Sequence, residues 1–183
     1  MEFALQQLMT GLSIGSILLL VALGLSIIYG SMGVINLAHG EFVMLGAYSA
    51  WGLQAFLGLD LLPSLALIFL MVALPGWVLE RTVIRRLYRR PLDTILATWG
   101  LGVMLQQIVR LTAGGELRYV QMPPSLSHSI PILGVETSAY RAFIFVVAAA
   151  LFCVTWFLMQ RTTIGMKLRA VVQDPSVAAC FGI

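Results

Sequence analysis

The feature that most constrains this chain is a long apolar stretch near its N-terminus. The 22 residues from position 8 to position 29 contain no charged side chain. A helix crosses the hydrocarbon core of a bilayer, about 30 Å thick, with about 20 apolar residues. The stretch therefore predicts a transmembrane helix. It has no basic start and is longer than the apolar part of a signal peptide, so we expect the helix to be retained.

The composition of the whole chain agrees with a membrane protein. Of the 183 residues, 60% are hydrophobic and 10% are charged, whereas a soluble domain has about 25% charged residues. Eight acidic and eleven basic residues cannot provide the polar surface of a soluble fold of this size. Most soluble enzymes and nucleic-acid-binding modules are thereby excluded.

Four further apolar stretches have the length of a membrane span or come close to it. Turn-type sequences rich in glycine separate several of them, at residues 30–33, 58–60 and 114–115. We predict an all-α fold, a polytopic transmembrane bundle of about five spans forming a single domain over residues 1–183. The four further spans are expected at residues 34–57, 61–79, 95–109 and 142–158.

The basic residues predict how the bundle is oriented. Arginine and lysine concentrate in the loop 80–91 and in the segment 161–183, and only Arg110, Arg118 and Arg141 belong to the other side. Cytoplasmic loops carry the excess of basic residues. We therefore expect both dense clusters in the cytoplasm and the N-terminus outside. The loop 112–140 is then extracytoplasmic, either as a dock for a ligand-delivering protein or as a connector.

Three polar side chains lie close together near the start of the second predicted span: Asn36, His39 and Glu41. Glu41 lies seven residues past Val34, which is about 10 Å along a helix. A charge at the bilayer centre costs about 3 kcal/mol on insertion scales, so we expect Glu41 to face protein or water. In one interpretation Asn36 and His39 share a helical face that serves transport. In the other, Asn36 caps a helix start and Glu41 lies at its positive end.

A second polar line runs along the fourth predicted span. Thr98, Gly102 and Gln106 recur every four residues and so share one helix face. The small residues Thr98 and Gly102 favour close helix packing, and Gln106 requires an interhelical hydrogen bond or a wet cavity. Packing and a role in a solute path both remain open. Gly11 and Gly15 in the first span form a similar pair, which we interpret as a packing surface.

The sequence carries no recognisable enzyme motif. It has two histidines and two cysteines without metal-ligand spacing, and it lacks a phosphate-binding glycine–lysine loop. Any energy from ATP would have to come from another chain. Near the C-terminus, Asp174 and Pro175 predict a short helix with aspartate as its cap. Such a helix suits docking into a partner's groove, or it is a connector to a further span.

Several segments resemble one family of membrane proteins. Residues 33–42, continuing to 46–48, are similar to the signature of the LivH-type permeases, as are residues 165–174 and 178–183. These permeases are inner-membrane subunits of bacterial ABC importers for branched-chain amino acids and related solutes. Family members continue with further spans. The resemblance therefore implies the N-terminal part of a longer permease, from a fragment or a truncated gene.

Within the family, three segments look more like the urea permease branch, the UrtB type. They are residues 91–101, the pair Gln106 and Gln107, and residues 138–144. The resemblance thus implies urea as the first expected substrate and branched-chain amino acids as the second.

The resemblance also implies a set of partners in the bacterial inner membrane. The chain would be a permease subunit and not an enzyme, binding no metal, nucleic acid or cofactor itself. Membrane lipid would surround it. Its protein partners would be a second permease subunit of the same or a different kind, two ATP-binding subunits that use ATP, and an extracytoplasmic solute-binding protein.

Two groups of residues are expected to carry this function. Candidates for the substrate path are Asn36, His39, Glu41, Thr98 and Gln106, and candidates for coupling to the ATPase are Arg169, Asp174, Pro175, Ala178 and Gly182. Three alternatives remain: a passive urea channel, an ion-coupled carrier, and a membrane interaction protein without transport. An ion-coupled carrier would require midplane charges and repeated halves.

Overall fold

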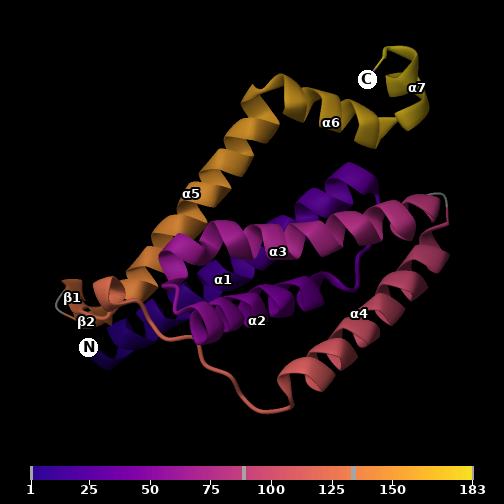
Figure 1. The fold of residues 1–183 in the computed structure, drawn as a ribbon. Helices are drawn as coiled ribbons and strands as arrows, with labels where there is room; N and C mark the ends of the chain where they lie inside the picture. Colours follow the sequence, from indigo (N-terminus) through magenta and orange to yellow (C-terminus); the bar gives the residue numbers. More distant parts are fainter. Residues whose placement is uncertain (1, 88–89, 133–134, 183) are drawn as a thin grey trace. The chain divides into compact units, whose positions relative to one another are not determined.

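The chain forms two compact, mostly helical units (Figure 1). The computed structural model describes residues 2–87, 90–132 and 135–182. One unit combines residues 1–33 with residues 124–183, and the other comprises residues 34–123. The predicted all-α character is confirmed, apart from one short hairpin.

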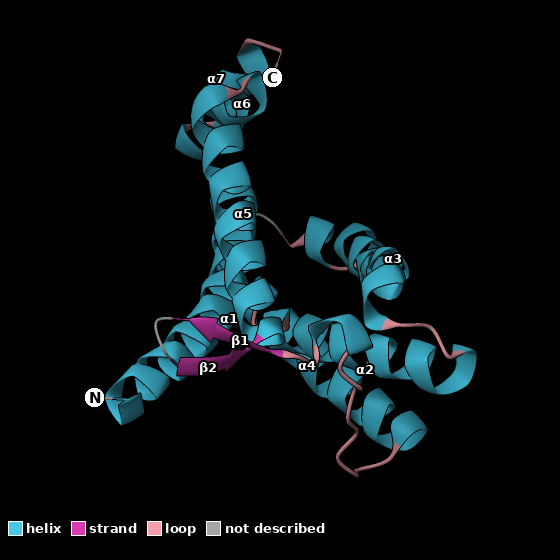
Figure 2. Ribbon diagram, turned by 90° about the vertical axis from the view of Figure 1, so that its left-hand side faces the viewer, coloured by secondary structure: helices cyan, strands magenta, loops and turns pink. Residues whose placement is uncertain are grey.

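The first unit is built on two long helices, α1 (Glu2–Met32) and α5 (Ala139–Arg161), which pack along each other. Figure 2 shows the hairpin of β1 (Ser129–Ile132) and β2 (Val135–Ser138) beside these helices. A short 3₁₀ turn, η2 (Pro124–Leu126), precedes the hairpin. After α5 come α6 (Thr163–Gln173) and α7 (Pro175–Cys180).

The second unit places α2 (His39–Leu57) against both α3 (Leu61–Thr82) and α4 (Pro91–Ala113). A 3₁₀ turn, η1 (Ile84–Arg86), follows α3. At the end of α2, Gly58 adopts a left-handed backbone with φ of 64°, and its N–H donates to the carbonyl of Gln54. Glycine adopts this conformation without a steric penalty. The turn predicted there is confirmed.

Within the described residues, four helices are long and apolar enough to cross a membrane. They cover Phe3–Gly30, Leu61–Arg86, Pro91–Ala113 and Ala139–Arg161. These contain four of the five predicted spans and extend beyond most of their predicted ends. The fifth, α2, is a helix of 19 residues. It falls outside this set because His39, Glu41 and Gln54 lower its mean hydropathy.

The start of α2 differs from the prediction. The helix was expected from Val34 but begins at His39. From position 34 to position 38 the side chains alternate: Val34, Asn36 and Ala38 are buried, while Ile35 and Leu37 are about half exposed. The segment is irregular and not helical, and it ends in a turn at residues 37 and 38, where Ala38 has φ of −80° and ψ of 3°. Asn36 therefore precedes the helix and does not share a helical face with His39.

The loop after α4 also contains structure that the sequence analysis did not predict. Ser129 pairs with Ser138 and Ile130 with Thr137 in an antiparallel ladder. Each strand has only four residues, too few for the alternation that reveals a strand in a sequence. The extracytoplasmic loop predicted at 112–140 thus ends in a small ordered hairpin.

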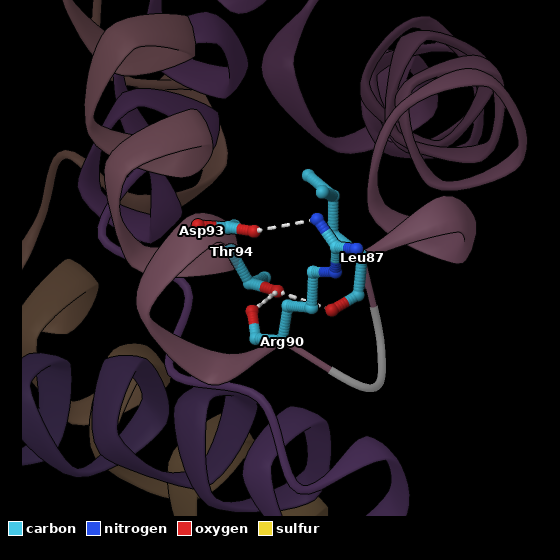
Figure 3. Close-up of polar contacts among 4 residues, drawn as sticks. All are labelled: Leu87, Arg90, Asp93 and Thr94. Carbon is cyan, nitrogen blue, oxygen red and sulfur yellow. Dashed lines mark hydrogen bonds and ion pairs between the residues drawn. The ribbon is translucent and has the colours of Figure 1, made fainter.

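The end of the arginine-rich loop is held by the first turn of α4 (Figure 3). The buried hydroxyl of Thr94 is shared between the carbonyls of Leu87, at 2.8 Å, and Arg90, at 2.9 Å. The ion pair of Arg90 with Asp93, at 3.6 Å, is exposed and so adds little stability. Pro91 opens the helix, where a missing N–H is tolerated.

A tight turn joins α5 to α6. The side chain of Thr162 caps α6 by accepting a hydrogen bond from the N–H of Gly165. Gly165 lies directly on the last turn of α5, so that an added methyl group would overlap the carbonyl oxygen of Met159 and come within 2.5 Å of that of Leu158. Glycine is therefore a steric requirement at this position.

We expect Gly165→Ala to destabilise the packing of α6 on α5 by about 1–3 kcal/mol, as overpacked positions do. Thermal unfolding in detergent and limited proteolysis near residue 161 would measure the change. Gly100→Ala is the matched control, because a methyl group there meets no described atom within 4 Å and alanine favours a helix by up to about 1 kcal/mol. Equal stability of the two variants would contradict the steric interpretation.

Candidate functional site

The irregular stretch before α2, residues 34–38, is held by side chains that bind its backbone N–H groups. The hydroxyl of Thr98, fully buried on α4, accepts the N–H of Leu37 at 3.2 Å and donates to the carbonyl of Ile95. The side-chain oxygen of Asn36 accepts the N–H of Ala38 at 3.0 Å. The backbone N–H of His39 donates to the carbonyl of Asn36. The N–H groups of three successive residues, at the entry to α2, are thereby satisfied.

A second contact with α4 lies in the first turn of α2. The amide nitrogen of Gln106 donates to a carboxylate oxygen of Glu41 at 2.6 Å. Gly102, between Thr98 and Gln106 on α4, leaves room for the side chain of Glu41. A methyl group at Gly102 would lie 3.4 Å from Cγ of Glu41. The predicted stripe on α4 therefore faces the predicted polar residues of α2. We call Asn36, Glu41, Thr98, Gly102 and Gln106 the polar seam.

The members of the polar seam divide into two kinds. Asn36 and Thr98 are buried, and their oxygens are engaged by backbone N–H groups. They position the start of α2 and do not themselves present a surface. Glu41 is half-buried and Gln106 is exposed, and His39 is half-buried nearby in the chain. After the bond between them, a carboxylate and an amide carbonyl oxygen remain as acceptors.

In the predicted helix start, Asn36 was expected as the cap. The structure places Ala38 at the cap position, and Asn36 makes a turn two residues earlier. Glu41 does lie in the first turn of α2, near the positive end of the helix dipole. The interpretation of this motif as a helix start is thus correct for Glu41, and it is wrong in detail for Asn36.

A further set of contacts in the second unit, between α2 and the chain after α4, was not predicted from the sequence. The side-chain amide of Gln54 on α2 donates to the carbonyl of Gln121 and accepts its N–H, at 3.1 and 2.6 Å. One turn earlier, the guanidinium of Arg118 lies 4.9 Å from the ring centre of Trp51. These contacts attach the chain after α4 to the end of α2. The spacing of Trp51 and Gln54 on one helix face is the signal available in the sequence.

All five predicted coupling residues lie in α6, α7 and the residues next to α7. Arg169 donates to the side chain of Gln160 at 3.0 Å. Asp174 caps α7, as predicted, and Pro175 occupies the first helical position. Ala178 is buried, whereas Val177 and Phe181 are exposed and lie one turn apart. Gly182 follows with a positive φ of 73°.

The carboxylate of Asp174 has three hydrogen-bond donors around it. The hydroxyl of Ser176 donates at 2.6 Å, and the backbone N–H groups of Val177 and Ser176 donate at 3.1 and 2.9 Å. These bonds favour the charged form and lower the pKa of Asp174, with the Ser176 hydroxyl as the largest cause. In the described part of the chain, no group of three metal-ligating side chains comes together.

The membrane-length helices and the polar seam define an integral membrane protein that holds polar groups within its helical bundle. Residues 7–183 match the family described as "Branched-chain amino acid transport system / permease component". The chain belongs to this family. This confirms the family resemblance seen in the sequence and makes the chain a multi-pass membrane protein.

The curated relatives agree with the family. The LivH permease protein of the high-affinity branched-chain amino acid transport system of Salmonella typhimurium is 32% identical over 99% of the chain. The BraD protein of Pseudomonas aeruginosa, of the same description, is 31% identical over 98%. The chain spans 63% and 62% of the length of these two relatives. A probable branched-chain amino acid permease of Methanocaldococcus jannaschii is 27% identical over 92% of the chain. No solved structure matches the chain.

The bond between Glu41 and Gln106 can be measured by a double-mutant cycle. We expect Glu41→Ala and Gln106→Ala to be coupled by about 1 kcal/mol of unfolding free energy, because a hydrogen bond to a carboxylate is lost in either variant. Gln107→Ala is the matched control, since Gln107 is the exposed neighbour on α4. A coupling of Glu41 to Gln106 no larger than its coupling to Gln107 would contradict the structure.

The cap of α7 should depend on pH. Because the pKa of Asp174 is lowered in the folded chain, its stabilisation is present above the ordinary carboxylate pKa and is lost as pH falls through the lowered value. The amide NMR signals of Ser176 and Val177 should shift with that lowered midpoint. In Asp174→Asn they should not titrate. A midpoint at or above the ordinary value would show that the cap is not formed.

Proposed function

We propose that this chain is part of the permease subunit of an ABC importer that moves branched-chain amino acids across the bacterial inner membrane. Membership of the permease family and the functions by which the LivH and BraD relatives are described support this substrate class. Every relative named above is described as a branched-chain amino acid permease, and none as a urea permease. We therefore rank amino acids above urea, reversing the order expected from the sequence.

The observation that carries the proposal is the exposed end of the polar seam. A zwitterionic amino acid brings an ammonium group, which requires acceptors when it leaves water. Glu41 and Gln106 offer a carboxylate and an amide carbonyl at one place, where α2 begins. A carboxylate within a membrane bundle is costly to maintain without a function. We assign Glu41 and Gln106 to the solute path and Asn36 and Thr98 to its support.

The C-terminal segment is proposed as the contact with an ATP-binding subunit. Val177 on α7 and Phe181 directly after it expose apolar side chains four residues apart, the spacing by which a helix docks in a groove. The hydrogen bond from Arg169 to Gln160 joins α6 to α5. A movement of the C-terminal segment would therefore be transmitted to a long helix. Two ATP-binding subunits would use the ATP, and a second permease subunit would complete the path. A solute-binding protein would deliver the solute outside.

Uptake by the full-length permease, assembled with its partners in vesicles, tests the proposal. We expect labelled leucine to be imported with ATP and labelled urea not to be. Glu41→Gln should lower leucine uptake about tenfold, because it removes the charge that meets the ammonium group. Gln107→Ala, the exposed neighbour of Gln106 on α4, should leave uptake unchanged.

Two outcomes would overturn the proposal. Import of urea alone would reassign the substrate, and uptake without ATP would indicate a passive channel. A photo-crosslinker at Val177 or Phe181 should form adducts with the ATP-binding subunit. One at Val103, an exposed residue of α4, serves as control. An absence of adducts at both Val177 and Phe181 would remove the coupling role of this segment.

A further inference from the structure

The first unit contains an open apolar groove between its two long helices. The groove has a volume of about 930 Å³ and is lined by α1 and α5. It follows α1 from Phe3 to Leu19, which is about 24 Å at the helical rise. One leaflet accounts for about half of the 30 Å hydrocarbon core. The groove is therefore long enough for an acyl chain of one leaflet.

Small residues make the floor of this groove. Gly11 and Gly15 on α1 line it, together with the buried Ala148 on α5. A methyl group on either glycine would meet no described atom within 4 Å. The expected packing of this glycine pair against another helix is therefore not formed within the described chain, and the glycines deepen the groove instead.

One end of the groove is polar. A hollow of about 270 Å³ adjoins it, sharing Phe3 and Gln7 with the groove and lined also by Gln6, Thr10 and Arg141. The guanidinium of Arg141 donates to the hydroxyl of Thr10 at 2.9 Å. A guanidinium has five N–H donors in a planar fork that suits phosphate, and the bond to Thr10 uses one of them.

We propose that this groove binds a phospholipid with a net negative headgroup. The acyl chain lies along Gly11 and Gly15, and the phosphate lies at Arg141. A transmembrane helix placed in the groove would cover the apolar walls but would bring no anion to the guanidinium. An anionic phospholipid supplies both, since a guanidinium binds phosphate oxygens through charge-assisted hydrogen bonds. The proposal is independent of the transported substrate.

A native residue allows a direct test, because Cys153 is exposed and lines the groove. In the purified chain with Cys180→Ser, a bimane label on Cys153 is reconstituted in phosphatidylcholine vesicles that contain lipids brominated on their acyl chains. We expect half-maximal quenching at an about fivefold lower fraction of brominated phosphatidylglycerol than of brominated phosphatidylcholine. At Leu67→Cys with Cys153→Ser, an exposed control position on α3 in the other unit, both lipids should quench alike.

Variants of the arginine separate the site from bulk lipid. Arg141→Gln should abolish the preference for phosphatidylglycerol, and Arg141→Lys should retain most of it. Arg110→Gln, at an exposed arginine near the end of α4, should leave it intact. Circular dichroism reports whether each variant keeps its helices, and Arg141→Lys provides the test if Arg141→Gln does not fold.

Four results would overturn the proposal: equal quenching by both lipids in the parent chain, an unchanged preference in Arg141→Gln, loss of the preference in Arg141→Lys, or a disulfide between the Cys153 residues of two copies in vesicles. Removal of the preference by inorganic phosphate would reassign the polar end to a free anion.

Discussion

The interaction on which the second unit depends is the hydrogen bond from the backbone of Leu37 to the hydroxyl of Thr98. An unsatisfied N–H group away from water costs about 1–3 kcal/mol, and in a bilayer irregular backbone survives only where protein satisfies it. The chain leaves the helical path before His39, and Thr98 and Asn36 supply acceptors there. The start of α2 is therefore defined by side chains and not by its own helix.

This arrangement explains why Glu41 lies where it does. Once α2 begins at His39, Glu41 falls in the first turn and faces α4. Gly102 admits its side chain, and Gln106 binds it. A buried end that supports the backbone is thus joined to a more exposed end at Glu41 and Gln106. Close approach of small residues recurs in the first unit, where Gly165 lets α6 turn directly over the end of α5.

Several local features could be predicted because they depend on neighbours in the sequence. The four-residue spacing of Thr98, Gly102 and Gln106 placed them on one face, and Asp174 before Pro175 indicated a capped helix. The start of α2 was missed because Val34, Ile35, Leu37 and Ala38 are apolar although they precede the helix, so hydropathy does not mark the boundary. Val34, Asn36 and Ala38 are buried because α4 covers one side of this stretch. That contact could not be predicted from the local sequence. The link between Gln54 and Gln121 joins positions 67 residues apart, beyond the reach of any periodicity.

By itself, the sequence determined that the chain is a membrane protein, where most of its spans lie, and which family it resembles. These properties follow from hydropathy and local motifs, since a bilayer selects long apolar segments one at a time. Only the tertiary structure decided that Thr98 is a buried support and that Gln106 is the partner of Glu41. Residues with identical spacing on one helix acquire different roles through what the neighbouring helix places against them. That contact spans 61 to 65 residues of chain.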